Sequence, residues 1–291
     1  MSIQPKRMLV VMAHPDDESF GMAGTIAKYV SEGVEVSLIC TTNGDVGTID
    51  PVFMEGYKTV AERRLAELKC AAETLKLSRV ITLGYRDSGM AGSEDNNHPD
   101  SLVSAPFEKV VERIVGVMRE IRPDVVVTFD PFGGYGHPDH IVTHRATVEA
   151  FRVSNDLTKF AEQLKGGLQP HQCKKLYFLT FDRRIFSLMV RFMQAVKIFG
   201  DPRKMGRNQD IDATAIVANT FPIHASIKTG KHRIVADKAR QCHASQLSGV
   251  GPRQFSQVAT RMVFGVRENF MRSFPPATGN VSEGDLFEDI R

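Results

Sequence analysis

The sequence lacks a long hydrophobic run, a strong excess of charge of either sign, and any close pair of cysteines. The apolar run near its N-terminus, residues 8–13, is too short for the hydrophobic segment of an export signal or for a membrane span. Lys and Arg exceed Asp and Glu by 37 − 34 = 3, short of the strongly basic balance of a dedicated nucleic-acid binder. We therefore expect neither export nor a nucleic-acid partner.

The cysteines lie far apart and include no CxxC pair; they are Cys40, Cys70, Cys173 and Cys242. This spacing indicates neither a zinc knuckle nor a disulfide scaffold. Cys40 has no evident histidine partner and is interpreted as a buried small residue rather than a nucleophile. We expect reduced thiols and a cytoplasmic location.

The composition is that of a globular protein, with 291 residues of which 42% are hydrophobic and 24% charged. Short β-rich apolar runs alternate with helical patterns, which indicates an α/β fold with a Rossmann-like, mainly parallel sheet flanked by helices. Expected strands cover residues 7–12, 35–41, 80–84, 125–129, 176–181 and 213–217. Expected helices cover residues 25–32, 59–75, 107–121, 139–152 and 234–246.

We expect one domain over residues 1–250, with a helical insertion at about 183–207, and a C-terminal extension over 251–291. The insertion contains an apolar helix at 183–199 with only a narrow polar stripe. This helix is interpreted as packed against its own protein or a second subunit of a homo-oligomer; contact with an anionic membrane surface is the alternative. Residues 280–291 carry four acidic side chains against one Arg and are expected to form a mobile tail.

The sequence AHPDDE, residues 13–18, follows the first expected strand, and open α/β sheets bind ligands at the carboxyl ends of strands. No GxGxxG or GxxxxGK[ST] fingerprint occurs there, which disfavours a dinucleotide or P-loop site. One imidazole and three carboxylates so close together repel or crowd one another unless a cation binds, and they suit zinc or ferrous iron. The alternative is that Asp16, Asp17 or Ser19 caps a helix beginning near Gly21.

A second cluster, DPFGGYGHPDH at residues 130–140, follows the fourth expected strand and again opens a helix. If the strand order is 3-2-1-4-5, the first and fourth strands are neighbours where the winding reverses, so both clusters face one crevice and can share one metal. A site with three protein ligands leaves room for the water that hydrolytic zinc requires. His144, one turn after His140, is interpreted as a surface or packing histidine.

Together, AHPDDE at 13–18 and GGYGHPDH at 133–140 resemble the motifs of the LmbE-like, or PIG-L, family of metal-dependent N-acetylglucosaminyl deacetylases. Weaker matches are an RxxE pattern at 64–67, RDSGM at 86–90 and HASQ at 243–246. The resemblance implies a hydrolase that removes an N-acetyl group from a small molecule containing N-acetylglucosamine.

For the metal, the resemblance implies that His14, Asp17 and His140 bind one divalent ion, zinc or iron. It implies that Asp16 is the general base for the attacking water. Glu18 completes the motif and is interpreted as a support for the loop or for a ligand, not as a catalytic residue.

For the substrate, the resemblance implies that His137 stabilises the tetrahedral intermediate or protonates the leaving amine, and that Asp139 holds it. Tyr135 matches a tyrosine that assists at the oxyanion. Arg64 and Asp87 match positions that contact the substrate.

The motif RDSGM resembles the family branch that acts on the inositol-linked glucosamine of mycothiol biosynthesis. A sister activity cleaves mycothiol conjugates at the corresponding amide, so an amidase of such thiol conjugates is one alternative. A metal- or sugar-binding module without turnover is another, and a membrane-docked deacetylase of glycosylated phosphatidylinositol is a third.

Overall fold

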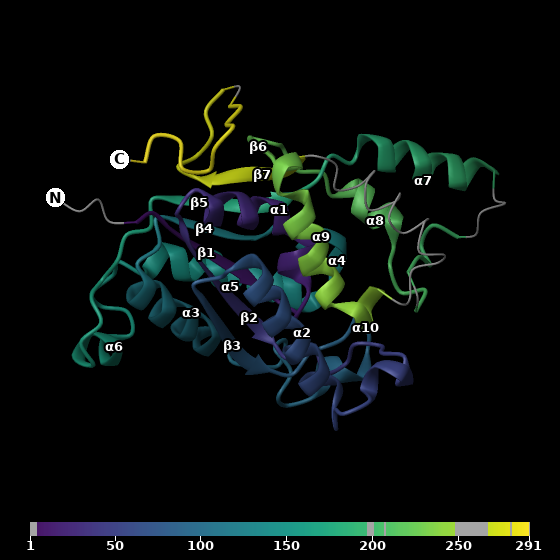
Figure 1. Cartoon of the computed structure of the whole chain (residues 1–291), viewed down its shortest axis with the longest axis horizontal. Coiled ribbons are helices and arrows are strands. Elements are labelled where there is room, and N and C mark those ends of the chain that lie inside the picture. The colour runs from purple at the N-terminus through teal and green to yellow at the C-terminus, as the bar shows by residue number, and fades with distance from the viewer. Residues whose placement is uncertain (1–4, 197–200, 207, 248–266, 280, 291) are drawn as a thin grey trace.

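The computed structural model describes residues 5–196, 201–206, 208–247, 267–279 and 281–290, which include a seven-stranded sheet with helices on both faces (Figure 1). The strand order is β3-β2-β1-β4-β5-β7-β6, so the condition that placed the two clusters at one crevice, the order 3-2-1-4-5, is met. Strands β1 to β5 are parallel, and β7 runs antiparallel to β5 and β6. The strands are β1 Arg7–Met12, β2 Glu35–Thr42, β3 Arg79–Tyr85, β4 Val125–Phe129, β5 Lys175–Thr180, β6 Ala225–Lys228 and β7 Arg267–Phe274.

Two apolar layers hold the helices on the sheet. Along β1, Met8, Val10 and Met12 belong to one buried cluster and Leu9 and Val11 to the other, because successive strand residues point to opposite faces. Helices α1, α2 and α9 contribute to the first cluster, and α3 and α5 to the second. The helices are α1 Asp17–Ser31, α2 Val60–Leu75, α3 Phe107–Ile121, α4 Gly133–Gly136, α5 Pro138–Val153, α6 Ala161–Lys165, α7 Arg184–Val196, α8 Ala213–Ala218, α9 Arg233–Cys242 and α10 Ala244–Leu247.

Residues 213–217 are a helix, α8, and the strand predicted there is wrong. The side chain of Asp212 accepts hydrogen bonds from the amides of Thr214 and Ala215, at 2.8 and 3.2 Å, which is a helix N-cap. A five-residue apolar run has no distinguishing period, so the capping aspartate decides its conformation.

Residues 281–290 pack on the domain. The prediction of a mobile C-terminal tail, made from its acidic charge, is therefore wrong for these residues. Leu286 and Phe287 are buried in the apolar cluster on the α1 face of the sheet. Glu283 is buried, and its Oε1 accepts hydrogen bonds from Lys175 and Arg272 at 2.9 and 2.8 Å. These paired charges allow an acidic segment to be ordered. The expected domain boundary at residue 250 lies outside the described residues.

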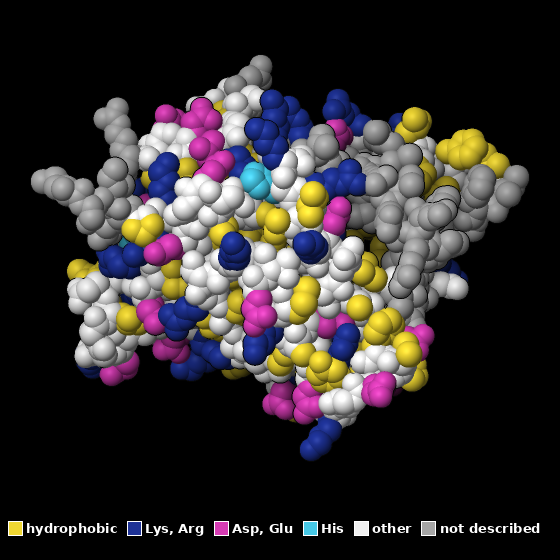
Figure 2. Space-filling view, viewed as in Figure 1, with side chains coloured by type: hydrophobic (Ala, Val, Ile, Leu, Met, Phe, Trp, Pro, Cys, Tyr) yellow, Lys and Arg dark blue, Asp and Glu magenta, His cyan; other side chains and the backbone are white. Residues whose placement is uncertain are grey.

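Most described side chains of helix α7 are exposed. Val190 is buried, whereas Leu188 and Phe192 are 70% and 55% exposed, and yellow side chains lie over this helix in Figure 2. That a second subunit or a membrane surface covers the exposed side of this helix stays a prediction. The last residues of the expected helix, 197–199, lie outside the described ones. Among the described helices, none has the length and apolar content needed to cross a membrane.

Cys70 and Cys242 form a disulfide between α2 and α9, so the expectation of reduced thiols is wrong for these two cysteines. They are 172 residues apart in the chain, and only the packing of α9 against α2 brings their Cα atoms to 5.7 Å. Cys40 is buried and free, as expected. The cytoplasmic location, inferred partly from cysteine spacing, stays a prediction.

Reduction of this disulfide is expected to lower the free energy of unfolding by about 2–5 kcal/mol, because the bond closes a long loop in the unfolded chain. Cys70 is exposed, so a dithiol reductant can reach the bond. Urea unfolding with and without the reductant measures the change. In Cys242→Ser the reductant should have no effect; an unchanged midpoint in the reduced wild type would contradict the disulfide's role.

Candidate active site

Two loops at the carboxyl ends of neighbouring strands meet at one point. β1 leads into His14 and Asp17, and β4 leads through a glycine turn into α5, which carries His140. His14 Nδ1 lies 3.0 Å from His140 Nε2 and 3.5 Å from Asp17 Oδ2. His140 Nε2 lies 3.4 Å from Asp17 Oδ1. The three ligands predicted from the sequence are therefore brought together.

The positions of these atoms fit a divalent metal. Ligand atoms about 2 Å from one tetrahedral ion lie roughly 3.3 Å from one another, close to the separations above, in which the two imidazoles approach different oxygens of Asp17. Burial lowers the pKa of His140 to about 4, so its imidazole is neutral near pH 7, as a metal ligand must be. Among the described residues, ligand atoms of His14, His137 and His140 lie within 4.8 Å of one another, and so do those of His14, Asp87, His137 and Asp139.

Hydrogen bonds determine which ring nitrogen of His14 and of His140 faces the proposed metal position. His140 Nδ1 donates to the carbonyl of Gly133 at 3.1 Å, which directs Nε2 toward Asp17. His14 Nε2 lies 3.1 Å from Asp139 Oδ2, so Nδ1 faces the other ligands. Such partners orient metal-binding imidazoles.

Asp139 contacts a different histidine from the one that the resemblance implies. Its carboxylate lies 4.0 Å from His137 Nδ1, beyond hydrogen-bond distance, and bonds His14 and the amide of Ser88 instead. His137 caps α5, because its Nδ1 accepts from the amide of Asp139 at 3.2 Å.

His144 packs inside the protein, where its Nδ1 donates to the carbonyl of Phe129 at 2.8 Å, so the interpretation of His144 as a packing residue is confirmed.

Asp16 lies beside the metal-binding cluster in a strained backbone conformation. Its φ is 148°, a value that residues other than glycine rarely adopt and that is typical of functional sites. Although it precedes α1, its side chain makes no capping hydrogen bond; its Oδ2 accepts from Arg64 Nη2 at 3.0 Å instead. Burial raises the pKa of Asp16 to about 6, with Arg64 acting in the opposite direction. A carboxylate with this pKa is suited to take a proton near neutral pH.

A cavity of about 910 Å³ opens next to these residues. Arg64 and Asp87, the predicted substrate contacts, both line it, with Arg64 Nη1 3.8 Å from Asp87 Oδ2. Burial would raise the pKa of Asp87, but the neighbouring His14 holds it below its usual range. Other residues of the wall include His14, Asp16, Tyr135, His137, Thr48, Met90, Asn208, Asp210 and Gln246.

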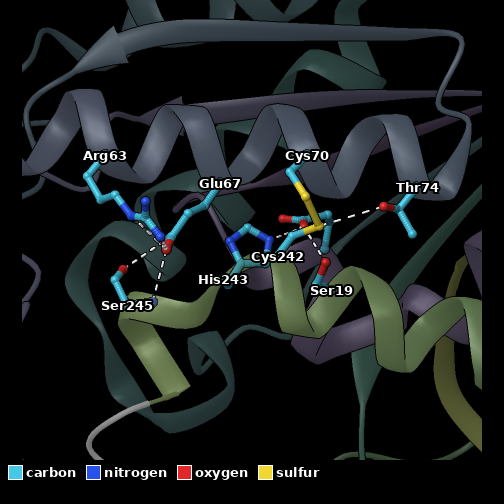
Figure 3. Close-up of a disulfide and its surroundings, with 9 residues drawn as sticks. Ser19, Arg63, Glu67, Cys70, Thr74, Cys242, His243 and Ser245 are labelled. Carbon is cyan, nitrogen blue, oxygen red and sulfur yellow. Dashed lines mark hydrogen bonds and ion pairs between the residues drawn. A yellow bond between two sulfur atoms is a disulfide. The ribbon is translucent and has the colours of Figure 1, made fainter. Parts of the chain in front are cut away.

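Two buried carboxylates, Glu18 and Glu67, connect this site to α9 and α10; the sequence predicted a support for the loop by Glu18 but not these contacts. Glu18 Oε1 lies 2.8 Å from His243 Nε2, and Glu18 Oε2 accepts from the amide of Asp16 at 3.2 Å. Glu67 accepts from the amide and hydroxyl of Ser245 at 2.9 and 2.7 Å (Figure 3). The matched motifs RxxE and HASQ are thus two halves of one contact. Both motifs can be recognised in the sequence, but the sequence does not show that they contact each other.

Comparison with known proteins identifies the family. Residues 9–151 match the family described as GlcNAc-PI de-N-acetylase. A 1D-myo-inositol 2-acetamido-2-deoxy-alpha-D-glucopyranoside deacetylase from Geodermatophilus obscurus is 32% identical over 256 residues, which is 85% of each chain. The chain belongs to the PIG-L family of deacetylases. A protein of the same name from Kineococcus radiotolerans is 35% identical over 99% of this chain and 84% of its own length.

Solved structures of low sequence identity share the fold. An N,N'-diacetylchitobiose deacetylase from Pyrococcus horikoshii aligns with a TM-score of 0.64 and 22% identity, over 92% of this chain and 84% of its own. A 4-carboxy-2-hydroxymuconate hydratase from Pseudomonas putida aligns with a TM-score of 0.57 and 18% identity, over 95% and 99%. Because a hydratase has the same fold as a deacetylase, the fold by itself does not determine the reaction.

Proposed function

We propose that this deacetylase hydrolyses the acetamide of an N-acetylglucosaminyl group joined to a small polyol, and releases acetate and a free amine. The observation that carries the proposal is the convergence of His14 Nδ1, Asp17 and His140 Nε2 next to Asp16 and a large cavity. Inositol is the polyol that the names of the similar proteins support.

His14, Asp17 and His140 are the proposed metal ligands. Zinc is the proposed metal, and iron is the alternative that the same donors accept. When bound, the metal supplies Lewis-acid chemistry, which makes a water molecule more acidic and polarises the amide carbonyl.

The protein's own residues handle the protons and the developing charge. Asp16, held by Arg64, takes a proton from the attacking water. Tyr135 and His137 line the same cavity and donate hydrogen bonds to the carbonyl oxygen as it becomes negative. The C–N bond then breaks, and the leaving nitrogen takes the proton that Asp16 removed from the water.

The cavity can hold more than one sugar ring. Its volume of about 910 Å³ lies toward the upper end for pockets that enclose drug-sized ligands. Arg64 and Asp87 are charged and lie in its wall, where they can bind sugar hydroxyls. A two-ring substrate therefore fits this proposal better than N-acetylglucosamine alone.

Removal of the metal tests the proposed function. We expect release of primary amine from N-acetylglucosaminyl-inositol, with slower release from N-acetylglucosamine and N,N'-diacetylchitobiose. A chelator should abolish the release and added zinc should restore it. The same panel includes a mycothiol-type conjugate, whose preferred cleavage would favour the amidase alternative.

Protein that holds one metal and binds the inositol substrate without releasing acetate would instead support the non-catalytic binding module. Iron loading in parallel with zinc shows which metal gives the higher kcat.

A further inference from the structure

Arg183 is a buried arginine outside both sequence clusters of the site, between β5 and α7. Its side chain is 2% exposed, and the Asp130 carboxylate that it faces is fully buried. Nη2 donates to Asp130 Oδ2 at 3.0 Å and to the carbonyl of Gly134 at 3.3 Å. Nη1 donates to the carbonyl of Ile216 at 2.8 Å. One guanidinium therefore joins the end of β4, the glycine turn and α8.

Asp130 connects this guanidinium to the glycine turn, residues 133–136. Its Oδ1 accepts from the amides of Phe132 and Gly134, both at 3.0 Å. Its Oδ2 binds Arg183. Oδ1 thus binds the turn directly, and Oδ2 binds Arg183, which itself donates to the carbonyl of Gly134 in the turn.

The glycine turn has little stiffness of its own. Gly133, Gly134 and Gly136 have φ angles of 69°, 71° and 92°, and glycine loses more conformational entropy on ordering than other residues. At Gly133 a side chain cannot be accommodated, because its Cβ would lie 2.7 Å from the Cβ of His140. The close approach that this glycine allows also lets its carbonyl accept from His140 Nδ1.

We propose that Arg183 is a positioning residue for the deacetylase: through Asp130 and Gly134, it holds the glycine turn that presents Tyr135 and His137 to the substrate. The inference rests on the proposed function, because its effect on turnover depends on those two side chains. The ordered turn also keeps the Gly133 carbonyl in place to orient His140.

Arg183 acts at a distance from the substrate. It lines a separate cavity of about 470 Å³, not the cavity beside the metal-binding cluster. Its guanidinium lies over the rings of Phe181 and Phe221, 4.6 and 5.6 Å from their centroids. These contacts hold the guanidinium plane so that its donors face Asp130 and the turn.

Arg183→Ala tests the proposal through kcat, KM and chemical rescue. We expect kcat to fall by about 10- to 100-fold, the range typical of residues that orient an active site. KM should change by less than about threefold, because Arg64 and Asp87 keep their places. Millimolar guanidinium, which can enter through the 470 Å³ cavity, should restore part of kcat, whereas urea should not. Since guanidinium unfolds proteins at molar concentrations, a variant that is only destabilised would not gain activity.

Arg184→Ala is the matched control. Arg184 lines the same 470 Å³ cavity, but its side chain is 89% exposed and pairs with Asp182. We expect wild-type kcat in this variant. Arg183→Lys keeps a cation without the planar fork and should show a smaller loss than Arg183→Ala.

Hydrogen exchange supplies a readout that needs no substrate. The amides of Phe132 and Gly134 should exchange faster in Arg183→Ala and unchanged in Arg184→Ala. If the wild type releases no amine, the proposed function fails while this measurement still tests the restraint on the turn. If Arg183→Ala does not fold, Arg183→Lys and Asp130→Asn carry the same measurements. Wild-type kcat in Arg183→Ala, unchanged exchange, or a loss that guanidinium deepens would overturn the proposal.

Discussion

Replacing Asp16 with Asn is expected to lower kcat by about 10²–10⁴-fold, the contribution of a general base, while the protein still binds one metal. Asn keeps the shape of the side chain and can still accept from Arg64, which now donates to the carboxylate at 3.0 Å. It cannot take a proton from water. Amine release at saturating substrate measures kcat, and metal content is measured on the same preparation.

The adjacent aspartate is the control for this prediction. Asp17→Asn should lose metal as well as activity, because Asp17 lies 3.4 Å from His140 Nε2 and 3.5 Å from His14 Nδ1. Metal content therefore distinguishes the two roles: it is kept when the general base Asp16 is replaced and lost when the metal ligand Asp17 is replaced. An Asp16→Asn enzyme that is fully active would rule out the proposed mechanism.

Replacing His140 with Ala is expected to remove the metal and, with it, all measurable turnover. His140 supplies one of three converging donors, so the loss of metal affinity should exceed the roughly 10- to 100-fold that outer partners contribute. Metal analysis after dialysis and zinc titration of the apoprotein measure the change. His140 also stacks on Phe129, with ring centroids 3.9 Å apart, so circular dichroism must confirm that the variant is folded.

His144 provides a control one helical turn away. It is buried and its Nδ1 donates to the carbonyl of Phe129, and it is not one of the three proposed ligands. His144→Gln should therefore retain one metal. Full metal content in His140→Ala would contradict the proposed ligand set.

Much of the candidate site could be predicted because its residues are close in sequence to strand ends. His14, Asp16 and Asp17 follow β1 within five residues, and His137 and His140 follow β4 through one short turn. Parallel neighbouring strands bring such loops to the same edge of the sheet. The pairing of Asp139 with His14 was not predictable, because it depends on side-chain directions that spacing alone does not set.

Local patterns also predicted most of the fold. The bounds of β1, β4 and α3 agree with the predicted ranges at both ends. Short or mixed patterns did not carry enough information: α8 has six residues, and β7 alternates burial in a polar sequence that did not suggest a strand. For such segments, tertiary contacts outweigh local propensity.

Periodicity and nearby residues were enough to predict the α/β fold and the two loops that carry the proposed metal ligands, whereas the central strand order was only a condition of that argument. The contacts between distant segments became known from the packing of the folded chain. Cys70 meets Cys242, Glu67 meets Ser245, and Arg183 meets Asp130. These partners come from elements whose packing depends on buried area and shape throughout the chain, and no local pattern records which residues that packing brings together.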